Sequence, residues 1–452
     1  MLSLRVVKCM LKRKITERLN NWKTDLNRKP LVIKGVRQCG KTFTALEFAR
    51  SNYSHVIYIN FYENPEYASL FSGSLKVDDL IMYMSALLGT EAVFEEGQTI
   101  IILDEIQHCP NARTSLKFFK TDGRYDVIAT GSLPSVSGYG DEELSIPVGY
   151  EEIIEMFPLD FEEFLWANGI SDQVIDLMQN SLEQCSPVPE PIHNRMRELL
   201  LQYTVIGGMP EVVQRFIDTH QISQTLVLQR NILDEYRDDM VKYAVGKDKS
   251  KIRECFDSIP KQLAKENKKF QYSVIRKKGT SEMFQGSIKW IEDAGIIRRC
   301  YNLTLPELPL DGNAIPEIFK VYMADTGLFT TMLEDGTQYD ILKGNLYGYK
   351  GAVFENLMAD ILGKSGRKLY YFHKDSGLEI DFIIRFQNEA TLLEIKASTG
   401  NAKSVKTILA HPEKYHVHRA VKLGNDYNVG YANGILTLPS YMGFLLCRDT
   451  AL

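Results

Sequence analysis

The sequence lacks the long apolar runs of a membrane protein. A helix that crosses a bilayer needs roughly 18 or more apolar residues in succession, whereas the longest apolar run here lies between Thr99 and Leu103 and ends at Asp104. The basic N-terminal stretch contains no small-residue cleavage site of the kind that ends a signal peptide. We therefore expect no signal peptide, no membrane span and no membrane partner.

Cysteine pairs are missing as well. The seven cysteines lie far apart along the chain, and no two of them form a Cys-x-x-Cys pair. This spacing argues against a zinc site and against a disulfide framework. Scattered, unpaired cysteines are typical of a reducing compartment, so we expect a cytoplasmic location.

The composition shows no bias toward one residue class. Hydrophobic residues make up 44% of the chain and charged residues 25%, values typical of soluble globular proteins. This excludes a collagen-like, low-complexity or wholly disordered chain. At roughly 100 to 200 residues per domain, the 452 residues predict two to four domains.

The net charge of −5 conceals one basic segment. Residues 241–300 carry 15 Lys and Arg against 7 Asp and Glu, which gives a local charge of +8. Such a segment can bind a polyanion such as DNA, although a solvated charged surface gives the same count. On the first interpretation, the side chains that contact phosphates are Lys268, Lys269, Arg276, Lys277, Lys278 and Lys289.

Residues 1–157 alternate between helical and extended patterns. Helical spacing over residues 13–22 and 42–50, and again before residue 88, separates apolar stretches at 31–34, 56–61, 100–103 and 126–130. Strands separated by helices are typical of a parallel sheet. We therefore predict a parallel α/β domain over residues 1–157.

Beyond residue 157 the pattern changes. Residues 158–243 are mostly helical and predict a lid or connector. In residues 244–305, three short helices precede an extended stretch, which is the layout of a winged helix-turn-helix. A connector over 306–350 leads to a last domain, 351–452, which opens with a helix at 353–362. The whole pattern predicts a multidomain α/β protein.

A phosphate-binding loop is predicted at residues 35–42. Their sequence, Gly-Val-Arg-Gln-Cys-Gly-Lys-Thr, fits G-x-x-x-x-G-K-[ST] and lies between a predicted strand and a predicted helix. Glycines let backbone N–H groups surround phosphates, Lys41 neutralises the β and γ oxygens, and Thr42 offers its hydroxyl to Mg²⁺. A glycine-rich turn without a ligand is the alternative. The residues predicted to bind ATP are Gly35, Arg37, Gln38, Cys39, Gly40, Lys41, Thr42 and Phe43.

An acidic pair ends the strand predicted at residues 100–103. Asp104 is predicted to lie beside the metal and Glu105 near the attacking water, the arrangement called Walker B. The next strand ends in Thr130-Gly131-Ser132, where Thr130 or Ser132 is placed to sense the γ-phosphate. We predict Lys41, Glu105 and Ser132 as catalytic residues of an ATPase, with Thr42 and Asp104 holding Mg²⁺.

At these motifs the sequence resembles a known family, the predicted AAA+ superfamily ATPases of bacteria and archaea. The resemblance implies an ATP-dependent switch or motor, often a homo-oligomer, with a nuclease-like C-terminal domain. The chain departs from it at Gly149-Tyr150, where many relatives have Gly-Arg, so we assign no arginine finger. Besides the loop and the acidic pair, the resemblance is carried by residues 157–164, 207–211, 236–239 and 324–328.

The C-terminal domain contains a predicted hairpin. If strands 378–386 and 390–397 are joined by an even-numbered loop such as Asn388-Glu389, residues whose numbers sum to 777 oppose each other. One face is then apolar and the other gathers Glu379, Asp381, Glu394 and Lys396, because opposed residues share a face. An odd-numbered loop would scatter apolar residues over both faces.

Carboxylates gathered on one face repel one another unless a cation lies between them. Oxygen ligands suit Mg²⁺ or Mn²⁺, and Lys396 is placed to steady the charge of phosphodiester cleavage. Asp381 followed by Glu394-Ile395-Lys396 resembles the D…(D/E)xK core of restriction-endonuclease-like domains, and Glu355 matches an acidic residue that often joins it. The predicted metal ligands are Glu355, Asp381 and Glu394. A solvated sheet face with incidental charges is the alternative.

Three functions follow from these predictions. The first is an ATP-hydrolysing AAA+-like switch whose nucleotide state repositions the winged helix and the nuclease-like tail. The second is an ATP-gated, metal-dependent DNA endonuclease, for which the tail is the effector. The third is a non-catalytic scaffold or sensor that binds ATP to recruit a partner.

Overall fold

The computed structural model describes residues 11–132, 149–243, 249–265, 268–345, 350–396, 402–424 and 428–450. The chain divides into two compact units. The N-terminal unit comprises Lys12–Pro158 with Asp293–Gly295, and the C-terminal unit comprises Leu159–Glu292 and Ile296–Leu452, to which Met1–Leu11 is also assigned. Each unit is described separately below.

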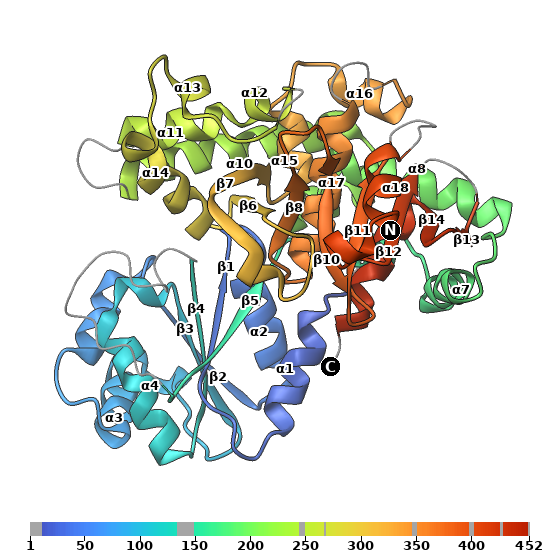
Figure 1. The fold of residues 1–452 in the computed structure, drawn as a ribbon. Coiled ribbons are helices and arrows are strands. Elements are labelled where there is room, and N and C mark those ends of the chain that lie inside the picture. The colour runs from blue at the N-terminus through green and yellow to red at the C-terminus, as the bar shows by residue number, and fades with distance from the viewer. Residues whose placement is uncertain are drawn as a thin grey trace. The chain divides into compact units, whose positions relative to one another are not determined.

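The N-terminal unit is built on a five-stranded parallel sheet with the order β2-β3-β4-β1-β5 (Figure 1). This confirms the predicted parallel α/β fold. Strand β5, which pairs with β1, was not predicted from the sequence. The elements are α1 (Ile15–Thr24), β1 (Leu31–Gly35), α2 (Lys41–Asn52), β2 (His55–Asn60), η1 (Pro65–Phe71), α3 (Val77–Leu88), η2 (Gly89–Glu91), β3 (Thr99–Asp104), η3 (Ile106–His108), α4 (Pro110–Asp122), β4 (Asp126–Ser132) and β5 (Glu152–Met156).

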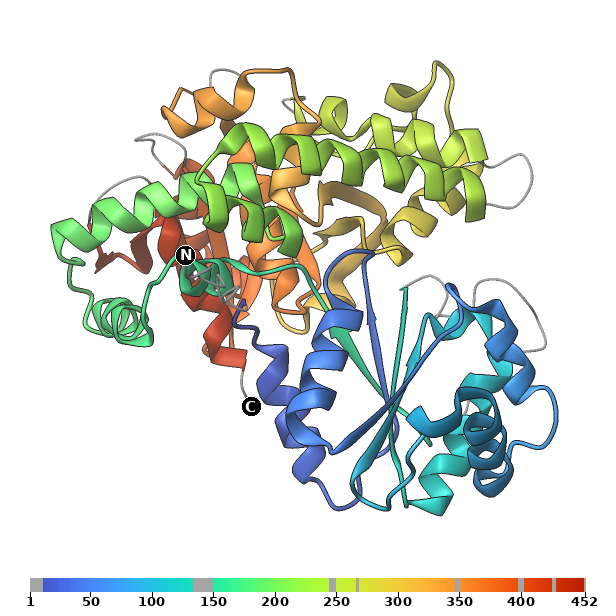
Figure 2. The same ribbon diagram turned by 180° about the vertical axis from the view of Figure 1, so that it is seen from behind.

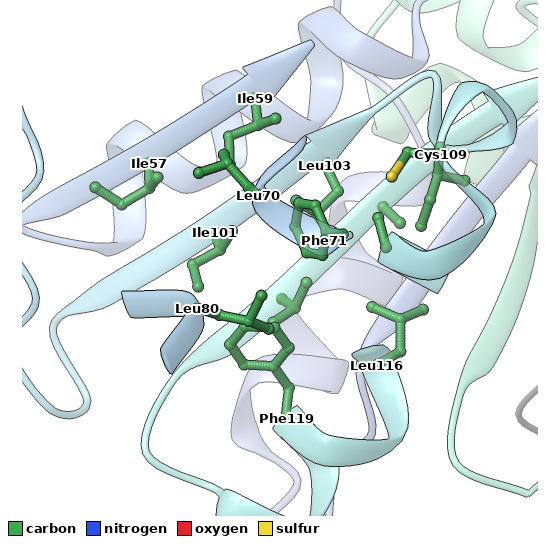
Figure 3. Close-up of a cluster of buried hydrophobic side chains, with 14 of the residues drawn as sticks. Ile57, Ile59, Leu70, Phe71, Leu80, Ile101, Leu103, Cys109, Leu116 and Phe119 are labelled. Atoms are coloured by element: carbon green, nitrogen blue, oxygen red, sulfur yellow. The ribbon is translucent and has the colours of Figure 1, made fainter. Parts of the chain in front are cut away.

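Helices cover both faces of this sheet, α1 and α2 on one side and α3 and α4 on the other (Figure 1). All residues of β3 are buried, as expected for a central strand of a parallel sheet. Under α3 and α4, Leu103, Phe71, Leu80 and Phe119 belong to one apolar cluster (Figure 3). Burial of side chains of this size contributes about 1.5 to 3 kcal/mol each, so the cluster fixes the strand ends that carry the polar residues described below.

The C-terminal unit begins with helices. A capping box at Asp160 and Glu163 starts α6, since each side chain bonds the other's backbone N–H. Helix α10 packs against α9 and α11 and is seen along its length in Figure 2. None of the described helices has the length and hydropathy that a bilayer span requires. The helices are α6 (Phe161–Ala167), α7 (Asp172–Glu183), α8 (Glu190–Ile206), α9 (Pro210–Thr219), α10 (Ile222–Tyr243), α11 (Lys249–Asp257), α12 (Ile259–Leu263), α13 (Tyr272–Ile275) and α14 (Ser281–Asp293).

A hairpin of β6 and β7 follows α14, and its second strand lies beyond residue 305, where the predicted winged-helix-like segment ends. The hairpin does not stand alone, because β6 also pairs with β8 in a sheet of order β7-β6-β8-β9. The segment predicted as a connector, 306–350, contains β7 and two helices. The elements are β6 (Ile297–Leu303), η5 (Leu310–Asn313), β7 (Ala314–Met323), α15 (Thr326–Thr331), α16 (Thr337–Leu342), α17 (Lys350–Lys364), β8 (Leu369–His373) and β9 (Glu379–Ile380).

A second sheet of the C-terminal unit has the order β10-β11-β12-β14-β13. Strands β11, β12 and β14 are parallel, and the two outer strands are antiparallel to their neighbours. Helix α18 covers one face through Val405 and Ile408, which belong to the same apolar cluster as Leu392 and Ala420. The elements are β10 (Phe382–Phe386), β11 (Glu389–Ile395), α18 (Lys403–Leu409), α19 (Pro412–Tyr415), β12 (Arg419–Gly424), β13 (Gly430–Ala432), β14 (Ile435–Pro439) and η7 (Ser440–Thr450).

The predicted hairpin differs from the structure in two respects. The predicted strand 378–386 is divided at Asp381 into β9 and β10, which belong to different sheets. The register is also shifted by two residues, since Phe382 opposes Leu393. The turn is Gln387-Asn388, and both residues have positive φ angles, 49° and 62°, which is the backbone of a two-residue hairpin turn. Because side chains alternate along a strand, a shift of two leaves each residue on its predicted face. Residue 397 of the predicted hairpin lies outside the described residues.

Two of the sequence motifs meet in the core of the C-terminal unit. Gly208 donates its backbone N–H to Asp325 Oδ2 at 2.7 Å, and a Cβ on Gly208 would lie 1.9 Å from the carbonyl oxygen of Leu159. Lys364, which is fully buried, bonds Asp325 and Asp360 at 3.0 and 2.7 Å. A buried ammonium group needs anionic partners, and Asp325 is one of them for Lys364. Because Asp325 also bonds Gly208, residues 207–211 and 324–328 hold this core together.

Candidate functional site

The loop between β1 and α2 is wound tightly. Gly40 precedes α2 with φ 96°, and Gln38 also has a positive φ of 63°, a region that non-glycine residues rarely adopt. A Cβ on Gly35 would lie 2.3 Å from the carbonyl oxygen of Met156. Glycine is therefore required at position 35 by close packing and at position 40 by its backbone angle.

Lys41 lies at the start of α2 and is 6% exposed. Its ammonium group donates hydrogen bonds to the carbonyl oxygens of Gly35 and Val36, both at 3.0 Å. The positive charge thus lies over the loop, beside the positive end of a helix, where an anion is stabilised. A phosphate entering the loop would replace these two neutral carbonyl acceptors with anionic oxygens, which bind an ammonium group more strongly.

The loop is anchored from behind. Arg13 donates to the carbonyl oxygens of Cys39 at 3.3 Å and of Phe157 at 2.6 Å. The Cys39 thiol points to Met156, whose carbonyl oxygen it contacts at 3.4 Å. Cys39, one of the predicted ATP-binding residues, can therefore contact a nucleotide only through its backbone. Phe43, another of these residues, is 59% exposed.

Asp104 joins the loop to the end of β3. Its Oδ1 accepts a hydrogen bond from Thr42 Oγ1 at 2.9 Å and a short one from Thr130 Oγ1. Its Oδ2 accepts bonds from Tyr58 Oη at 2.8 Å and Asn60 Nδ2 at 3.0 Å. Asp104 is 2% exposed, so four donors hold a buried carboxylate in one orientation. The structure thus brings together two residues predicted to hold Mg²⁺.

Tyr58 and Asn60 were missed by the sequence analysis. They lie on β2, whose last residue, Asn60, is in register with Asp104 on β3. Burial is the largest cause that raises the pKa of Tyr58, so the phenol stays a donor at neutral pH. The sequence did contain a signal for Asn60, since it is a polar residue at the end of the strand that precedes the acidic pair. The carboxyl ends of parallel strands meet at one edge of a sheet, which brings such a residue close to Asp104.

Glu105 adopts a strained backbone conformation, with φ 53° and ψ 49°. A left-handed conformation at a residue other than glycine costs on the order of 1 kcal/mol and is common at functional sites. Gln107 Nε2 bonds Glu105 Oε2 at 2.5 Å, so the half-buried carboxylate is held in place. Its geometry suits a residue that orients water.

Thr130 and Ser132 are both buried but differ in position. Thr130 is fully buried and its hydroxyl is bonded to Asp104. Ser132 lies at the carboxyl end of β4, in register with Gly35, the first residue of the loop. Of the two predicted γ-phosphate sensors, the structure places Ser132 next to the loop and gives Thr130 a positioning role.

The C-terminal cluster brings together Asp381, Glu394 and Lys396. Asp381 Oδ2 accepts the backbone N–H of Ile395 at 2.8 Å, and Lys396 Nζ lies 2.5 Å from Glu394 Oε1. Glu394 Oε2 is buried and has no hydrogen-bond partner. A buried carboxylate oxygen without a hydrogen-bond partner is costly.

Glu355 has partners that the sequence analysis did not foresee. Tyr322 Oη donates to Glu355 Oε2 at 3.0 Å, and the ammonium groups of Lys268 and Lys320 lie beside the carboxylate. Burial alone would raise the pKa of Glu355, but these two ammonium groups hold it below its usual value. Lys320 also bonds Glu379 at 2.8 Å. Glu355 is therefore neutralised by Lys320 from β7 and by Lys268, which lies between α12 and α13.

Asp381 and Glu394 have raised pKa values. For Asp381 the cause is burial, followed by repulsion from Glu355 and Glu394. For Glu394 it is again burial, opposed by the bond from Lys396. Over the described ranges, no three His, Cys, Asp or Glu side chains are arranged to hold a metal ion. Glu355, one of the three predicted metal ligands, is paired with Lys268 and Lys320 in the structure.

The basic segment is partly consumed by ion pairs within the unit. Lys268 pairs with Glu355, and Arg276 Nη2 lies 2.5 Å from Glu254 Oε1. Lys277 and Lys278 are exposed. Lys268 and Arg276, which belong to the six predicted phosphate-contacting residues, thus pair with carboxylates of the same unit.

Family models match three parts of the chain. An AAA domain matches residues 27–165. A domain of unknown function, DUF8612, matches residues 197–339, and another, DUF4143, matches residues 350–441. Residues 27–165 are thus similar to an AAA-type domain. Neither of the other two models names an activity, and no match to a curated protein was found.

Several solved structures share a remote similarity. The Walker-type ATPase PABY2304 of Pyrococcus abyssi is 16% identical, with 72% of this chain and 96% of that chain covered and a TM-score of 0.43. The ORC2 protein of Aeropyrum pernix is 14% identical, with 76% and 94% covered and a TM-score of 0.38. DnaA from Aquifex aeolicus is 12% identical, with 62% and 86% covered and a TM-score of 0.26. TM-scores under 0.5 are too low to support an inference about function.

Proposed function

We propose that this protein binds and hydrolyses ATP and acts as a nucleotide-driven switch. The observation that supports it is the bond between Thr42 and Asp104, which joins a phosphate-binding loop to an acidic strand end at 2.9 Å. A hydroxyl and a carboxylate are the oxygen ligands that Mg²⁺ prefers beside a nucleotide. The strained Glu105 lies one residue further along the same strand end.

Each residue has a distinct role in the proposed reaction. Backbone N–H groups of residues 36–42 and the Lys41 ammonium group bind the β- and γ-phosphates. Thr42 and Asp104 would hold Mg²⁺, which neutralises charge on the transferred phosphoryl group. Glu105 orients the attacking water, and Ser132 donates to the γ-phosphate from the end of β4. The switch then acts through Lys41 and Ser132, which contact the γ-phosphate that ATP has and ADP lacks.

The direct test is phosphate release from ATP by the purified chain, with and without Mg²⁺. The proposal predicts hydrolysis that requires Mg²⁺ and stops in EDTA. Very slow hydrolysis with tight retention of ATP would favour the non-catalytic scaffold instead. Absence of both binding and hydrolysis would contradict an ATP-dependent function altogether.

Tyr58 provides a finer test, because its hydroxyl donates to Asp104 and accepts a bond from Asn60, which is itself a donor to Asp104. In Tyr58→Phe the Asp104 carboxylate loses one of its four hydrogen-bond donors, which is worth about 1 kcal/mol. The affinity for Mn²⁺ in the presence of ATP should therefore fall about 5-fold. ATP binding without metal should stay unchanged. Mn²⁺ titration followed by electron paramagnetic resonance measures this. The matched control is Tyr53→Phe, which removes a 2.7 Å bond to Asp126 on the same unit. Equal effects of the two variants would show that Tyr58 has no specific role.

We further propose that nucleotide state is coupled to residues 244–305, as a winged-helix-like segment, and to residues 351–452, as a nuclease-like domain. This proposal also includes DNA contacts through exposed residues such as Lys277 and Lys278. It further includes assembly into a homo-oligomer and a cytoplasmic location. The six cysteines among the described residues are free, which supports a reducing environment.

The second candidate function is metal-dependent cleavage of DNA by the C-terminal cluster. It is supported by the cluster of Asp381, Glu394 and Lys396, in which Glu394 Oε2 has no hydrogen-bond partner. If it is correct, nicking of plasmid DNA with Mn²⁺ should fall at least about 100-fold in Asp381→Asn and in Lys396→Ala. The control is Lys414→Ala, an exposed lysine on the same unit. Nicking that persists in both cluster variants would rule out this site.

A further inference from the structure

The end of strand β5 packs against the phosphate loop. Met156, the last residue of the strand, is 1% exposed. Its carbonyl oxygen lies so close to Gly35 that a Cβ on that glycine would come within 2.3 Å of it, and the Cys39 thiol contacts the same oxygen at 3.4 Å. Because groups packed this closely cannot move independently, a change in the loop also displaces Met156.

The next residue, Phe157, is tied to the loop through Arg13. The guanidinium group donates to the carbonyl oxygen of Phe157 at 2.6 Å and to that of Cys39 at 3.3 Å. Hydrogen bonds from a charged donor are roughly twice as strong as neutral ones. These contacts lie within the N-terminal unit, whose main segment ends at the next residue, Pro158. Arg13 therefore holds the end of this segment against the loop.

The first residue of the C-terminal unit, Leu159, is held by contacts within its own unit. Leu159 is fully buried, its N–H donates to the carbonyl oxygen of Gly208 at 2.7 Å, and its own carbonyl oxygen accepts a bond from Tyr203 Oη at 2.9 Å. Gly208 bonds Asp325, and Lys364 donates to Tyr203 Oη at 2.9 Å. Leu159 is thus fixed to the buried ionic core of Asp325, Asp360 and Lys364.

Residues 156–159 therefore connect the phosphate loop to this ionic core along the chain. The loop holds residues 156 and 157, the core holds residue 159, and Pro158 alone lies between them. Proline has a fixed φ angle, so the connection can absorb little movement at either end. The connection includes the start of residues 157–164, a motif to which the proposed reaction assigns no role.

Nucleotide binding changes the contacts at the loop end of this connection. In the structure, the Lys41 ammonium group bonds the carbonyl oxygens of Gly35 and Val36. A phosphate that draws this group away releases Gly35, the residue that packs on Met156. A ligand shifts a conformational equilibrium when it binds one of two states more tightly, and the altered contacts at Gly35 provide that difference.

We propose that residues 156–159 transmit the nucleotide state of the loop to the ionic core of the C-terminal unit, with Arg13 as a positioning residue. This inference rests on the proposed ATP-driven switch and assigns the part of the chain through which it acts. Bound phosphates restrain the loop, so they should also restrain Leu159 and make the opening of its bond to Gly208 less frequent.

The test is hydrogen–deuterium exchange of the full chain with and without a non-hydrolysable ATP analogue and Mg²⁺. Exchange at the N–H groups of Leu159 and Gly208 should slow at least about 5-fold when nucleotide binds. Insertion of two glycines between Phe157 and Pro158 should abolish this change and leave ATP affinity unchanged, because the contacts on both sides are kept. The same insertion after Gly73, in an exposed turn of the N-terminal unit, is the control and should preserve the change.

A reciprocal measurement uses ATP affinity as its readout, because coupling between two sites acts in both directions. Tyr203→Phe removes the hydroxyl that holds Leu159 and should weaken ATP binding between about 2-fold and 5-fold. The effect should vanish when the insertion before Pro158 is also present. Arg13→Ala should reduce the nucleotide-dependent change in exchange, whereas Arg18→Ala, at an exposed arginine of α1, should not.

Nucleotide that binds without slowing exchange at Leu159 and Gly208 would overturn the inference. So would slowing that persists in the chain with the insertion before Pro158. In both cases the ATP-dependent function itself stands, whereas a chain that does not bind ATP at all would overturn both. Circular dichroism shows whether each variant is folded, and if the insertion prevents folding, Pro158→Gly replaces it and should weaken the change in exchange.

Discussion

Lys41→Ala is expected to weaken ATP binding at least about 100-fold. The ammonium group is positioned over the loop by the carbonyl oxygens of Gly35 and Val36, each at 3.0 Å. When phosphate replaces them, it makes charge-assisted bonds worth about 1.5 to 3 kcal/mol each. Loss of two such bonds corresponds to the expected change in affinity. Isothermal titration calorimetry with ATP and Mg²⁺ measures it.

The control for this variant is Lys76→Ala, which removes an exposed lysine from the same unit. It should bind ATP like the wild-type chain, because residue 76 precedes α3 and lies outside the loop. Lys41→Ala also leaves two loop carbonyls without a donor, so its thermal unfolding must be recorded alongside. A folded Lys41→Ala protein with wild-type ATP affinity would contradict the assignment of the loop.

Glu105→Gln is expected to retain ATP binding while its turnover falls by at least about 100-fold. The change removes a negative charge and a proton acceptor but keeps the shape of the side chain. The amide oxygen of the new residue can still accept the bond from Gln107, so the strained backbone should persist. Positioned proton acceptors contribute roughly 100-fold to 10,000-fold to catalysis. Single-turnover hydrolysis separates this effect from product release.

Glu96→Gln is the matched control, since it makes the same chemical change at an exposed position before β3. Its turnover should equal that of the wild-type chain. If Glu105→Gln hydrolysed ATP at the wild-type rate, another residue would have to orient the water. If it lost ATP binding as well, Glu105 would have a structural role rather than a catalytic one.

Local sequence was sufficient to predict the phosphate loop. The spacing of Gly35, Gly40 and Lys41 encodes a turn whose backbone angles only certain residues adopt, and its flanks encode a strand and a helix. The acidic pair of Asp104 and Glu105 could also be predicted from local sequence, because the apolar run before it predicts a buried strand. The parallel sheet then places both at one edge.

Contacts between distant segments could not be predicted in the same way. Tyr58 and Asn60 reach Asp104 because β2 lies next to β3, and no local pattern states that neighbour relation. Lys320 reaches Glu355 from β7, a strand that lies within the predicted connector. A buried lysine in an apolar strand has no recognisable sequence signature until its partner is known.

The hairpin shows what the hydrophobic pattern does and does not determine. Alternation assigned Glu394 and Asp381 to one face, and the structure keeps them together through the bond from Ile395 to Asp381. The register, however, depends on which two residues form the turn, and the pattern is unchanged by a shift of two. The turn at Gln387-Asn388 was decided by residues that tolerate positive φ angles.

The central claim is most directly tested by a crystal structure with a non-hydrolysable ATP analogue and Mg²⁺. Our account predicts the triphosphate in the loop of residues 35–42, the Lys41 ammonium group turned from its two carbonyls onto the β- and γ-phosphates, and the metal about 2.1 Å from Thr42 Oγ1 and adjacent to Asp104. Nucleotide bound at another place, or a metal ion far from Thr42 and Asp104, would contradict it.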